Sequence, residues 1–381
     1  MASKKILMVA GETSGDLHGA HLLEAIRQID PDVRFFGVGG EHLERKGMRL
    51  LYPSRLLSVV GITEVVFKLG TILKVLKGLK ASLDREQPDL VILIDCPDFN
   101  LRLAKIARQK GIPVLYYISP QVWAWRPGRV KVIAERVKKM VVFFPFEVPL
   151  YQAAGVDVEW VGHPLIDIVK PTLSKEEAFR KLGLDPRRRT IGLLPGSRPL
   201  EVKRLLPPLL ASAHLLQQEI SDLQFVIPLA PGLTPDILSP WTEKNVLSLK
   251  VIRGWTYDVM NLCELLILAS GTATLEAAIL EKPMIIIYQV SLLTSWVGRA
   301  MIRVNHIGLA NLVAGKGVAP ELIQKDVNPK KITEEALRIL KDSVLQQNMV
   351  ESLKGVRQRL GDPGAAQRAA RIVLSMLQKE N

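Results

Sequence analysis

Residues 91–100 read VILIDCPDFN, and this stretch decides the fold, because four apolar residues run directly into two acids, a proline and an asparagine. A fully apolar run is typical of a strand buried on both faces of a parallel sheet, with the polar residues at its carboxyl end. Doubly wound sheets bind their ligands at that edge. The stretch therefore predicts an α/β fold. Asp95 and Asp98 become candidate functional residues, although either could instead cap the following helix.

Further apolar runs occur on both sides of this stretch, separated by helical patterns. Up to residue 165 they are KILMVAG, VRFFGVGG, LVILID, PVLYYIS, KMVVFF and VEWVG, and after residue 189 they are TIGLLPGS, LQFVIPLA, LSLKVIRG, LLILASG and PMIIIYQV. Such alternation predicts parallel sheets covered by helices on both faces. We therefore predict two doubly wound, Rossmann-like lobes that face a cleft, with a helical C-terminus.

The domain boundaries follow from the same alternation. A chain of 381 residues is long for a single hydrophobic core. We predict an N-terminal lobe over 1–165, a linker over 166–189 and a C-terminal lobe over 190–345. Helices over 346–381 are expected to pack back on the first lobe.

The formal charge of +13 indicates an anionic partner or a solvated basic surface. No zinc-knuckle, recognition-helix or aromatic RNA-binding pattern occurs, so we expect no nucleic-acid partner and favour an anionic membrane surface. Cys96 and Cys263 show no metal-ligand spacing and fit a reducing cytoplasm. The apolar run at the N-terminus is too short for a signal peptide, which predicts a protein that is not exported.

Two segments combine apolar and basic residues in a way that is typical of lipid contact. Residues 56–80 are strongly apolar and carry Phe67, Lys68 and Lys74, and the loop SPQVWAWRPGR carries Trp123, Trp125 and Arg126. A plain buried helix explains the first segment equally well, and single-strand nucleic-acid stacking uses the ingredients of the second. The longest uncharged run, 283–298, is too short to span a bilayer.

Two strand-to-helix turns in the second lobe suit a nucleoside diphosphate. The turn in IGLLPGSRPLEV presents Gly196, Ser197 and Arg198, which offer backbone N–H groups, a helix N-terminus and a planar cation. The turn in LASGTATLEAA presents Ser270, Gly271 and Thr272, followed by a glutamate that could accept the hydroxyls of a ribose, namely Glu276. An ordinary turn and an ordinary helix cap are the alternatives. Neither the Walker pattern nor GxGxxG occurs, which argues against a nicotinamide or flavin cofactor.

The first lobe offers an acid at another strand exit. In VAGETSGDLHGA, Glu12 follows an apolar strand, and Gly11, Gly15 and Gly19 recur every fourth residue. These glycines allow close approach by a ligand, or simply close packing of a helix on the sheet. His18 and His21 have no third ligand nearby in sequence, so we predict no metal site.

The motifs together resemble a known family. GETSGD, DCPDFN, SPQVWAWRPGR, PFE, GHPL, LLPGSRPLEV, SGTATLE and LANLVAG occur in the order and approximate spacing of the bacterial lipid-A-disaccharide synthases, and the resemblance covers residues 5–375. It implies a GT-B fold and an inverting, metal-independent glycosyltransferase without a cofactor. The implied reaction moves diacylglucosamine from UDP to diacylglucosamine 1-phosphate, giving a β-1,6-linked disaccharide 1-phosphate and UDP. A homodimer and a cytoplasmic protein peripherally bound to the inner membrane are also implied.

The resemblance assigns roles to individual positions. Arg198 matches an arginine implicated in nucleotide binding, Glu276 matches the acid at the ribose, and Asn311 matches an asparagine beside the nucleotide. Ala310 stands where the family usually has proline, which affects the backbone at Asn311.

For the acceptor, the resemblance makes Asp95 the base and Glu12 a further acid of the same lobe. We favour Asp95 over Asp98 for the chemistry, with Asp98 as a structural acid. A UDP-N-acetylglucosamine epimerase of the same fold, or a non-enzymatic protein that binds nucleic acid or membranes, are the rival functions.

Overall fold

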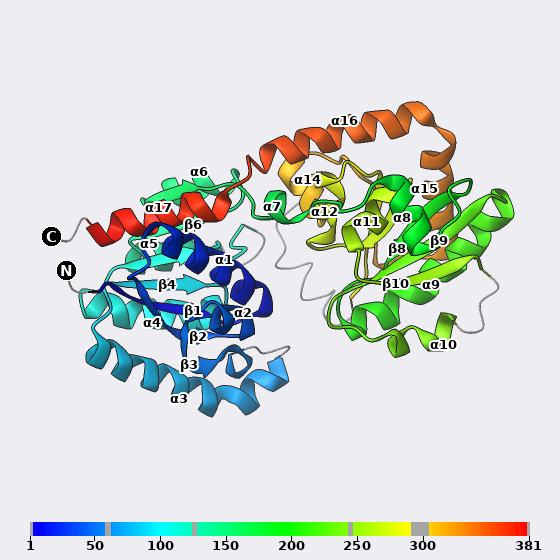
Figure 1. The fold of residues 1–381 in the computed structure, drawn as a ribbon. Coiled ribbons are helices and arrows are strands. Elements are labelled where there is room, and N and C mark those ends of the chain that lie inside the picture. The colour runs from blue at the N-terminus through cyan, green and yellow to red at the C-terminus, as the bar shows by residue number, and fades with distance from the viewer. Residues whose placement is uncertain (1–2, 58–61, 124–127, 243–246, 291–304, 379–381) are drawn as a thin grey trace. The chain divides into compact units, whose positions relative to one another are not determined.

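The computed structural model describes residues 3–57, 62–123, 128–242, 247–290 and 305–378 (Figure 1). The chain divides into two compact units. The first comprises 1–164 and 362–381, and the second comprises 165–361. The polypeptide therefore leaves the first unit after Pro164 and returns to it at Asp362.

The first unit is built on a parallel sheet of seven strands among the described residues, in the order β3-β2-β1-β4-β5-β6-β7. The strands are β1 (Lys5–Ala10), β2 (Arg34–Gly39), β3 (Arg49–Pro53), β4 (Leu90–Ile94), β5 (Val114–Tyr117), β6 (Lys139–Val142) and β7 (Val158–Trp160). The order reverses direction between β1 and β4, which pair in parallel with Ala10 opposite Ile94. In doubly wound sheets the crevice that binds ligands opens at this reversal.

Helices cover both faces of this sheet. They are α1 (Thr13–Ile29), α2 (Glu41–Arg45), α3 (Ile62–Glu86), α4 (Pro97–Gln109), α5 (Arg129–Arg136), α6 (Glu147–Gln152) and α17 (Ala365–Gln378). The core on one face contains side chains of α1, α2 and α17, and the core on the other contains side chains of α3 to α6. Figure 1 shows α17 (red) packed along α1 (dark blue).

The second unit repeats the plan with a parallel sheet that has six strands in the described part of the chain, in the order β10-β9-β8-β11-β12-β13. The strands are β8 (Arg189–Leu194), β9 (Leu223–Leu229), β10 (Leu249–Arg253), β11 (Leu265–Ala269), β12 (Met284–Tyr288) and β13 (Glu321–Ile323). Here the order reverses between β8 and β11, which also pair in parallel.

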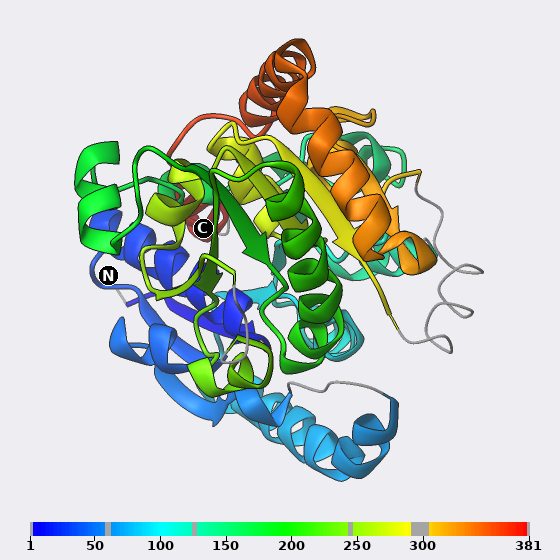
Figure 2. The same ribbon diagram turned by 90° about the vertical axis from the view of Figure 1, so that its right-hand side faces the viewer.

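The helices of the second unit flank this sheet. They are α7 (Leu165–Ile168), α8 (Lys175–Leu182), α9 (Pro199–Glu219), α10 (Ser239–Thr242), α11 (Thr256–Leu262), α12 (Ala273–Ile279), α14 (Leu309–Ala314), α15 (Pro329–Lys341) and α16 (Ser343–Arg359). Figure 2 shows α15 (orange) beside α9 (green), and α16 packs on α12 and α14.

The C-terminal segment splits between the two units. Helix α16 belongs to the second unit, whereas α17 packs on α1 in the first. Arg368 of α17 donates a hydrogen bond from Nε to the carbonyl of Val161 at 2.8 Å. The residues predicted as a linker, 166–189, lie within the second unit and contain α8.

Candidate active site

Asp95 lies at the reversal of strand order in the first unit. It directly follows β4, and Gly11 and Glu12 directly follow the neighbouring strand β1. The backbone N–H of Gly11 donates to Asp95 Oδ1 at 2.9 Å, and the N–H of Glu12 donates to Asp95 Oδ2 at 3.0 Å. The carboxylate therefore accepts backbone N–H groups at the N-terminus of α1. Negative charge is favourable there because the first N–H groups of a helix have no partner within the helix and because of the helix dipole.

The glycines around this carboxylate are required for close packing. A β-carbon on Gly11 would stand 2.2 Å from Cys96 Sγ, and one on Gly19 would stand 2.9 Å from Ile94 Cδ1. Both distances are shorter than non-bonded atoms allow. Close packing of α1 on the sheet, one of the two predicted explanations, thus accounts for these two positions.

The backbone after β4 adopts an unusual conformation. Asp95 has a φ of 54° and Cys96 a φ of 36°, so two successive non-glycine residues lie in the left-handed region. Each such residue costs on the order of 1–3 kcal/mol and persists only where its surroundings hold it. Residues in this state occur preferentially at functional sites, which supports the prediction that Asp95 is a functional residue.

The pKa of Asp95 is raised to about 7, first because burial disfavours the charged carboxylate. The hydrogen bond from the Gly11 N–H opposes this effect, and the nearby charge of Glu12 adds to it. A pKa close to neutral pH leaves a substantial fraction of the carboxylate deprotonated and makes it a stronger base than an ordinary aspartate, as general base catalysis requires. Burial also raises the pKa of the Cys96 thiol, which therefore stays protonated.

The two other predicted acids of this unit are exposed. Glu12 is the N-cap residue of α1, but its side chain makes no capping hydrogen bond. Asp98 lies in the first turn of α4 with 73% of its side chain exposed, and it forms an ion pair with Arg129. Of the three acids, Asp95 alone is partly buried.

The second unit contains a pocket of about 850 Å³ at the carboxyl ends of β8, β9, β10 and β11. It is lined by Lys170, Thr172, Leu194, Gly196, Ser197, Arg198, Glu201, Pro228, Ala230, Pro231, Gly254, Trp255, Thr256, Tyr257, Asp258, Ala269, Ser270, Gly271, Thr272, Ala273 and Glu276. Seven of the eight residues predicted to bind UDP are in this lining, which extends around the reversal of strand order between β8 and β11.

Glu201 fills part of the turn after β8. The backbone N–H groups of Ser197 and Arg198 donate to Glu201 Oε2 at 3.2 and 3.3 Å. Glu201 Oε1 also lies 3.5 Å from Arg198 Nη1. The N–H groups that we predicted for a diphosphate thus already donate to a carboxylate, while 74% of the Arg198 side chain remains exposed.

The turn after β11 presents Glu276 to the pocket from α12. Tyr257 donates its hydroxyl to Glu276 Oε1 at 3.4 Å. Burial raises the pKa of Glu276, and the hydrogen bond from Tyr257 opposes that shift. Ser270 donates its hydroxyl to the carbonyl of Ile307 at 3.0 Å, so that side chain is already used within the loop.

Among the lining residues that were not predicted from the sequence are Trp255 and Asp258. Trp255 has a left-handed backbone with a φ of 56°, and Lys181 Nζ lies 3.8 Å from the centroid of its ring. Asp258 is buried and accepts hydrogen bonds from the N–H groups of Thr172 and Leu173 at 2.7 and 2.8 Å. Trp255 could have been predicted as a site residue, because it follows an apolar strand, β10, and the glycine at its carboxyl end, Gly254. No sequence signal reveals the partners of Asp258.

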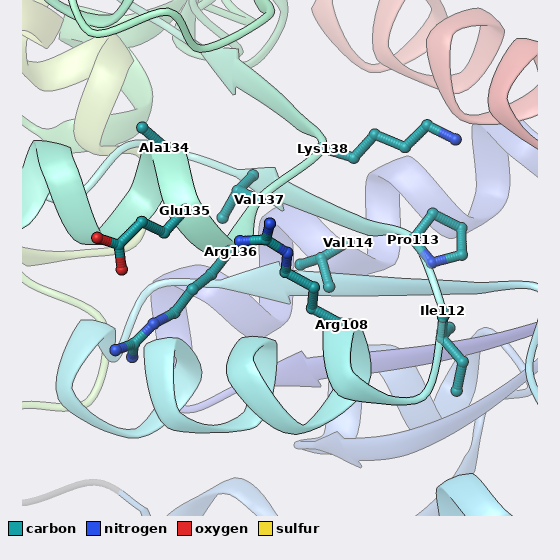
Figure 3. A pocket seen from close by; sticks show the side chains of 10 residues that line it. Arg108, Ile112, Pro113, Val114, Ala134, Glu135, Arg136, Val137 and Lys138 are labelled. Carbon is teal, nitrogen blue, oxygen red and sulfur yellow. The ribbon is translucent and has the colours of Figure 1, made fainter.

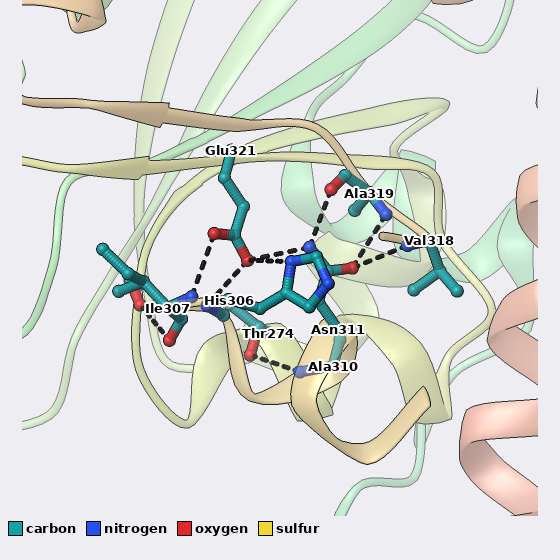
Figure 4. A network of polar contacts seen from close by, with 10 residues as sticks. Thr274, His306, Ile307, Ala310, Asn311, Val318, Ala319 and Glu321 are labelled. Atoms are coloured by element: carbon teal, nitrogen blue, oxygen red, sulfur yellow. Dashed lines mark hydrogen bonds and ion pairs between the residues drawn. The ribbon is translucent and has the colours of Figure 1, made fainter. Parts of the chain in front are cut away.

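Asn311, the eighth predicted nucleotide contact, is not among the residues that line the pocket. Its amide nitrogen donates to Ala319 O and Glu321 Oε1, both at 2.8 Å, and its oxygen accepts from the N–H groups of Val318 and Ala319 at 2.8 and 2.9 Å (Figure 4). The buried amide is thus fully engaged inside the protein. The structure gives Asn311 an internal role, in which it holds the segment before β13.

The alanine next to Asn311 makes a contact that proline could not make. The N–H of Ala310 donates to Thr274 Oγ1 at 3.3 Å, and that hydroxyl donates to Gly271 O at 2.8 Å. This chain of hydrogen bonds ties α14 to the start of α12.

The predicted lipid contacts are described only in part. Trp125, Arg126 and the side chains of Phe67 and Lys68 lie outside the described residues. Trp123 is half-buried, its indole N–H donates to Glu147 Oε1 at 3.2 Å, and burial raises the pKa of Glu147 to about 7. Lys74, Lys77 and Lys80 are exposed on α3, and two exposed leucines lie on the same helix, Leu69 and Leu73.

No helix in the described part of the chain is long and apolar enough to cross a membrane. Among the same residues, no group of three or more His, Cys, Asp or Glu side chains is arranged to hold a metal ion.

A smaller hollow of about 330 Å³ lies at the opposite edge of the first sheet (Figure 3). It is bordered by the amino ends of β5 and β6, and Arg108, Glu135, Arg136 and Lys138 are its charged lining residues. Because Asp95 lies at the carboxyl edge, this hollow is separate from the site around Asp95.

Two doubly wound parallel sheets, with polar groups gathered where each strand order reverses, define a protein of the GT-B fold. A calicheamicin glycosyltransferase has a similar structure, with a TM-score of 0.64 at 14% identity over 100% of both chains. A UDP-GlcNAc 2-epimerase from Neisseria meningitidis matches with a TM-score of 0.62 at 12% identity, over 99% of this chain and 100% of that one. At this low sequence identity, both comparisons show a similarity of fold alone.

Comparison of sequences adds the family. The family model described as lipid-A-disaccharide synthetase matches residues 6–373. The lipid-A-disaccharide synthase of Geobacter metallireducens is 48% identical over 378 residues, which are 99% of this chain and 98% of that protein. The chain belongs to the lipid-A-disaccharide synthase family, and it has lipid-A-disaccharide synthase activity in lipid A biosynthesis. The predicted fold class and activity are confirmed.

Proposed function

We propose that the chain moves a 2,3-diacylglucosamine unit from its UDP carrier to the primary hydroxyl of 2,3-diacylglucosamine 1-phosphate, with inversion. The products are the β-1,6-linked disaccharide 1-phosphate and UDP. The observation that carries this proposal is the half-buried Asp95, whose pKa near 7 lies where a general base works at neutral pH. The first unit binds the acceptor in this proposal, and the second unit binds the donor.

In the proposed step, Asp95 removes the proton of the acceptor hydroxyl. The oxygen then forms a bond to the anomeric carbon of the donor sugar, and the bond from that carbon to the UDP oxygen breaks. Each carboxylate oxygen of Asp95 accepts one N–H, and the Cys96 side chain donates a further hydrogen bond to the same carboxylate. Two carboxylate oxygens have about four acceptor sites, so one remains for this proton. Burial stabilises the neutral acid that results.

The donor binds in the pocket of the second unit, whose volume of about 850 Å³ suits a nucleotide. Glu276 accepts hydrogen bonds from the ribose hydroxyls. Arg198, together with the backbone around Gly271 and Thr272, stabilises the negative charge of the leaving diphosphate without a metal ion. Positive charge that is already in place is most effective, because it needs no rearrangement while the bond breaks.

The experiment that tests the proposal measures UDP release by the purified protein with donor and acceptor lipids, separately and together. Release that requires both lipids, and that Asp95→Asn abolishes while UDP affinity stays within about twofold, supports the transfer and the base. Turnover of UDP-N-acetylglucosamine alone would instead indicate an epimerase. An Asp95→Asn variant that keeps more than a few per cent of the activity would remove Asp95 from the mechanism.

We also propose that the protein binds the inner-membrane surface peripherally, through the exposed lysines and leucines of α3 and through the loop that carries Trp123. Replacing Lys74, Lys77 and Lys80 with Gln should weaken binding of the protein to vesicles with anionic lipids. Binding to vesicles of neutral lipids should not change. The matched control replaces three exposed lysines of the second unit, Lys316, Lys325 and Lys330. Equal loss in both triple variants would indicate a non-specific charge effect.

Trp123→Ala should weaken vesicle binding as well. Unchanged partitioning of that variant would assign the ring to packing against Glu147 and Phe146.

A further inference from the structure

We propose that Asn100 and Tyr116 are positioning residues that hold the backbone of Asp95 in its left-handed conformation and thereby aim the carboxylate. The inference rests on the proposed role of Asp95 as the general base. It adds two side chains from two other elements to the machinery of the reaction.

The starting point is the turn that follows β4. Asp95 and Cys96 are both left-handed, with φ of 54° and 36°. In this state an L-residue brings its β-carbon close to its backbone, which is why single occurrences are uncommon. Two in succession need support from outside the turn.

That support comes from two buried side chains. Asn100, on α4, donates from Nδ2 to the carbonyl of Ile94 at 2.9 Å and to the carbonyl of Asp95 at 2.8 Å. Tyr116, on β5, donates its hydroxyl to the same Asp95 carbonyl at 2.5 Å. The carbonyl oxygen of Asp95 therefore receives two donors, which uses both of its lone pairs.

The other half of the Asn100 amide supports this interpretation. Asn100 Oδ1 is buried and has no hydrogen-bond partner among the described residues. A buried polar atom without a partner is destabilising and calls for an explanation. Here the explanation is that the NH₂ group of the same amide is needed for two carbonyls of the turn.

Holding the carbonyl also orients the carboxylate, because the peptide plane after Asp95 fixes the direction of its Cα–Cβ bond. In the observed conformation the carboxylate meets the N–H groups of Gly11 and Glu12. These hydrogen bonds favour the charged form, and burial opposes them. If the turn relaxes, the carboxylate loses these donors and becomes harder to ionise.

Tyr116→Phe is the variant that tests the proposal, because it removes one oxygen atom and preserves the shape of the ring. The matched control is Tyr117→Phe, since Tyr117 is equally buried on the same strand but belongs to the core on the opposite face of the sheet. Asn100→Ala, which removes two donors, is the second variant. Thermal melts establish that each protein is folded.

We expect Tyr116→Phe to lower kcat by about fivefold, the value of one hydrogen bond, and Asn100→Ala to lower it further. Both variants should move the acid limb of the pH–rate profile to higher pH. UDP affinity, which belongs to the other unit, should not change, and Tyr117→Phe should match the wild type in all three measurements.

Unchanged kcat and an unmoved acid limb in both Tyr116→Phe and Asn100→Ala, beside an inactive Asp95→Asn, would overturn the positioning role and leave the base in place. An active Asp95→Asn would overturn the base itself. The two failures are therefore distinguishable.

Discussion

Gly15 and Asp95 lie so close together that a β-carbon on Gly15 would stand 1.8 Å from Asp95 Oδ2. The carboxylate can keep its place over the first turn of α1 only while position 15 has no side chain. Gly15 is therefore part of the geometry that presents Asp95.

Gly15→Ala should displace the carboxylate and lower activity more than tenfold, because loss of one well-placed group costs at least about that factor. It should also lower the free energy of unfolding by about 1–3 kcal/mol, as overpacking does. Gly355→Ala, at a helical glycine with open space around it, is the control and should stabilise the protein by up to about 1 kcal/mol. Urea unfolding and UDP release measure both effects. Wild-type activity in Gly15→Ala would mean that the carboxylate is free to move.

The raised pKa of Asp95 predicts an acid limb near pH 7 in the pH dependence of kcat/KM, with activity lost as the pH falls through that value. The free energy of unfolding should change in the opposite direction with pH. Because the pKa in the folded state exceeds that of an unfolded aspartate, the folded protein binds the proton more tightly between about pH 4 and pH 7. Raising the pH through this window should therefore lower the free energy of unfolding.

Asp95→Asn should remove this contribution, so its stability relative to the wild type should increase from pH 5 to pH 8. Urea unfolding at several pH values measures the difference. A constant difference between the two proteins would indicate that Asp95 titrates near its ordinary pKa.

The proposed roles of Glu276 and Arg198 in UDP binding can be distinguished by comparing the affinities for uridine and UDP. Glu276→Gln should weaken uridine and UDP by the same factor, about tenfold or more, because hydrogen bonds to a charged acceptor are worth about 1.5–3 kcal/mol each. Arg198→Ala should weaken UDP but not uridine, because only UDP carries the diphosphate. Isothermal titration calorimetry with uridine and with UDP measures the affinity of each variant for both ligands. Equal effects of Arg198→Ala on uridine and UDP would contradict a contact with the diphosphate.

Glu201→Gln should tighten UDP binding by about two- to fivefold. The wild-type carboxylate lies beside Arg198 and repels an incoming diphosphate, whereas Gln can still accept the N–H groups of Ser197 and Arg198 without the charge. Uridine affinity is the internal control and should not change. Weaker UDP binding would show that the charge of Glu201 is needed to hold the turn.

Asn311→Ala should lower the free energy of unfolding by about 2–4 kcal/mol, because it leaves the buried N–H groups of Val318 and Ala319 without their acceptor. UDP affinity, measured well below the melting temperature, should stay within about twofold. Ala310→Pro is the companion variant, which removes the hydrogen bond to Thr274 and adds a ring at a fully buried position but leaves the Asn311 amide in place. A large loss of UDP affinity without a loss of stability would restore Asn311 to the nucleotide site.

The strands and the location of the site are predictable because both depend on local pattern. Apolar runs such as LVILID mark β4, and a polar residue after such a run falls at the carboxyl edge, so the position of Asp95 at that edge follows from the sequence. The left-handed backbone of Asp95 and Cys96 is not predictable, because non-glycine residues rarely adopt it and their support comes from Asn100 and Tyr116.

In the pocket of the second unit, too, the residues at strand ends are predictable from local pattern, and the long-range contacts are not. Arg198 and Glu276 follow readable strand-to-helix turns. The position of Glu201 over the turn depends on a glycine with a φ of 115°, Gly196, where a β-carbon would stand 2.5 Å from Glu201 Oε2. The contact of Asp258 with Thr172 spans 86 residues and leaves no mark in either local pattern.

The path of the chain also constrains how the protein is made. The first unit needs α17, whose Ala369, Val373 and Met376 belong to the same core as Leu23 and Ile26 of α1. A ribosome delivers α1 first and α17 only after the whole second unit has emerged. Until then, the apolar side chains of α1 that pack against α17 have no partner from that helix, so the core on this face of the sheet is completed last.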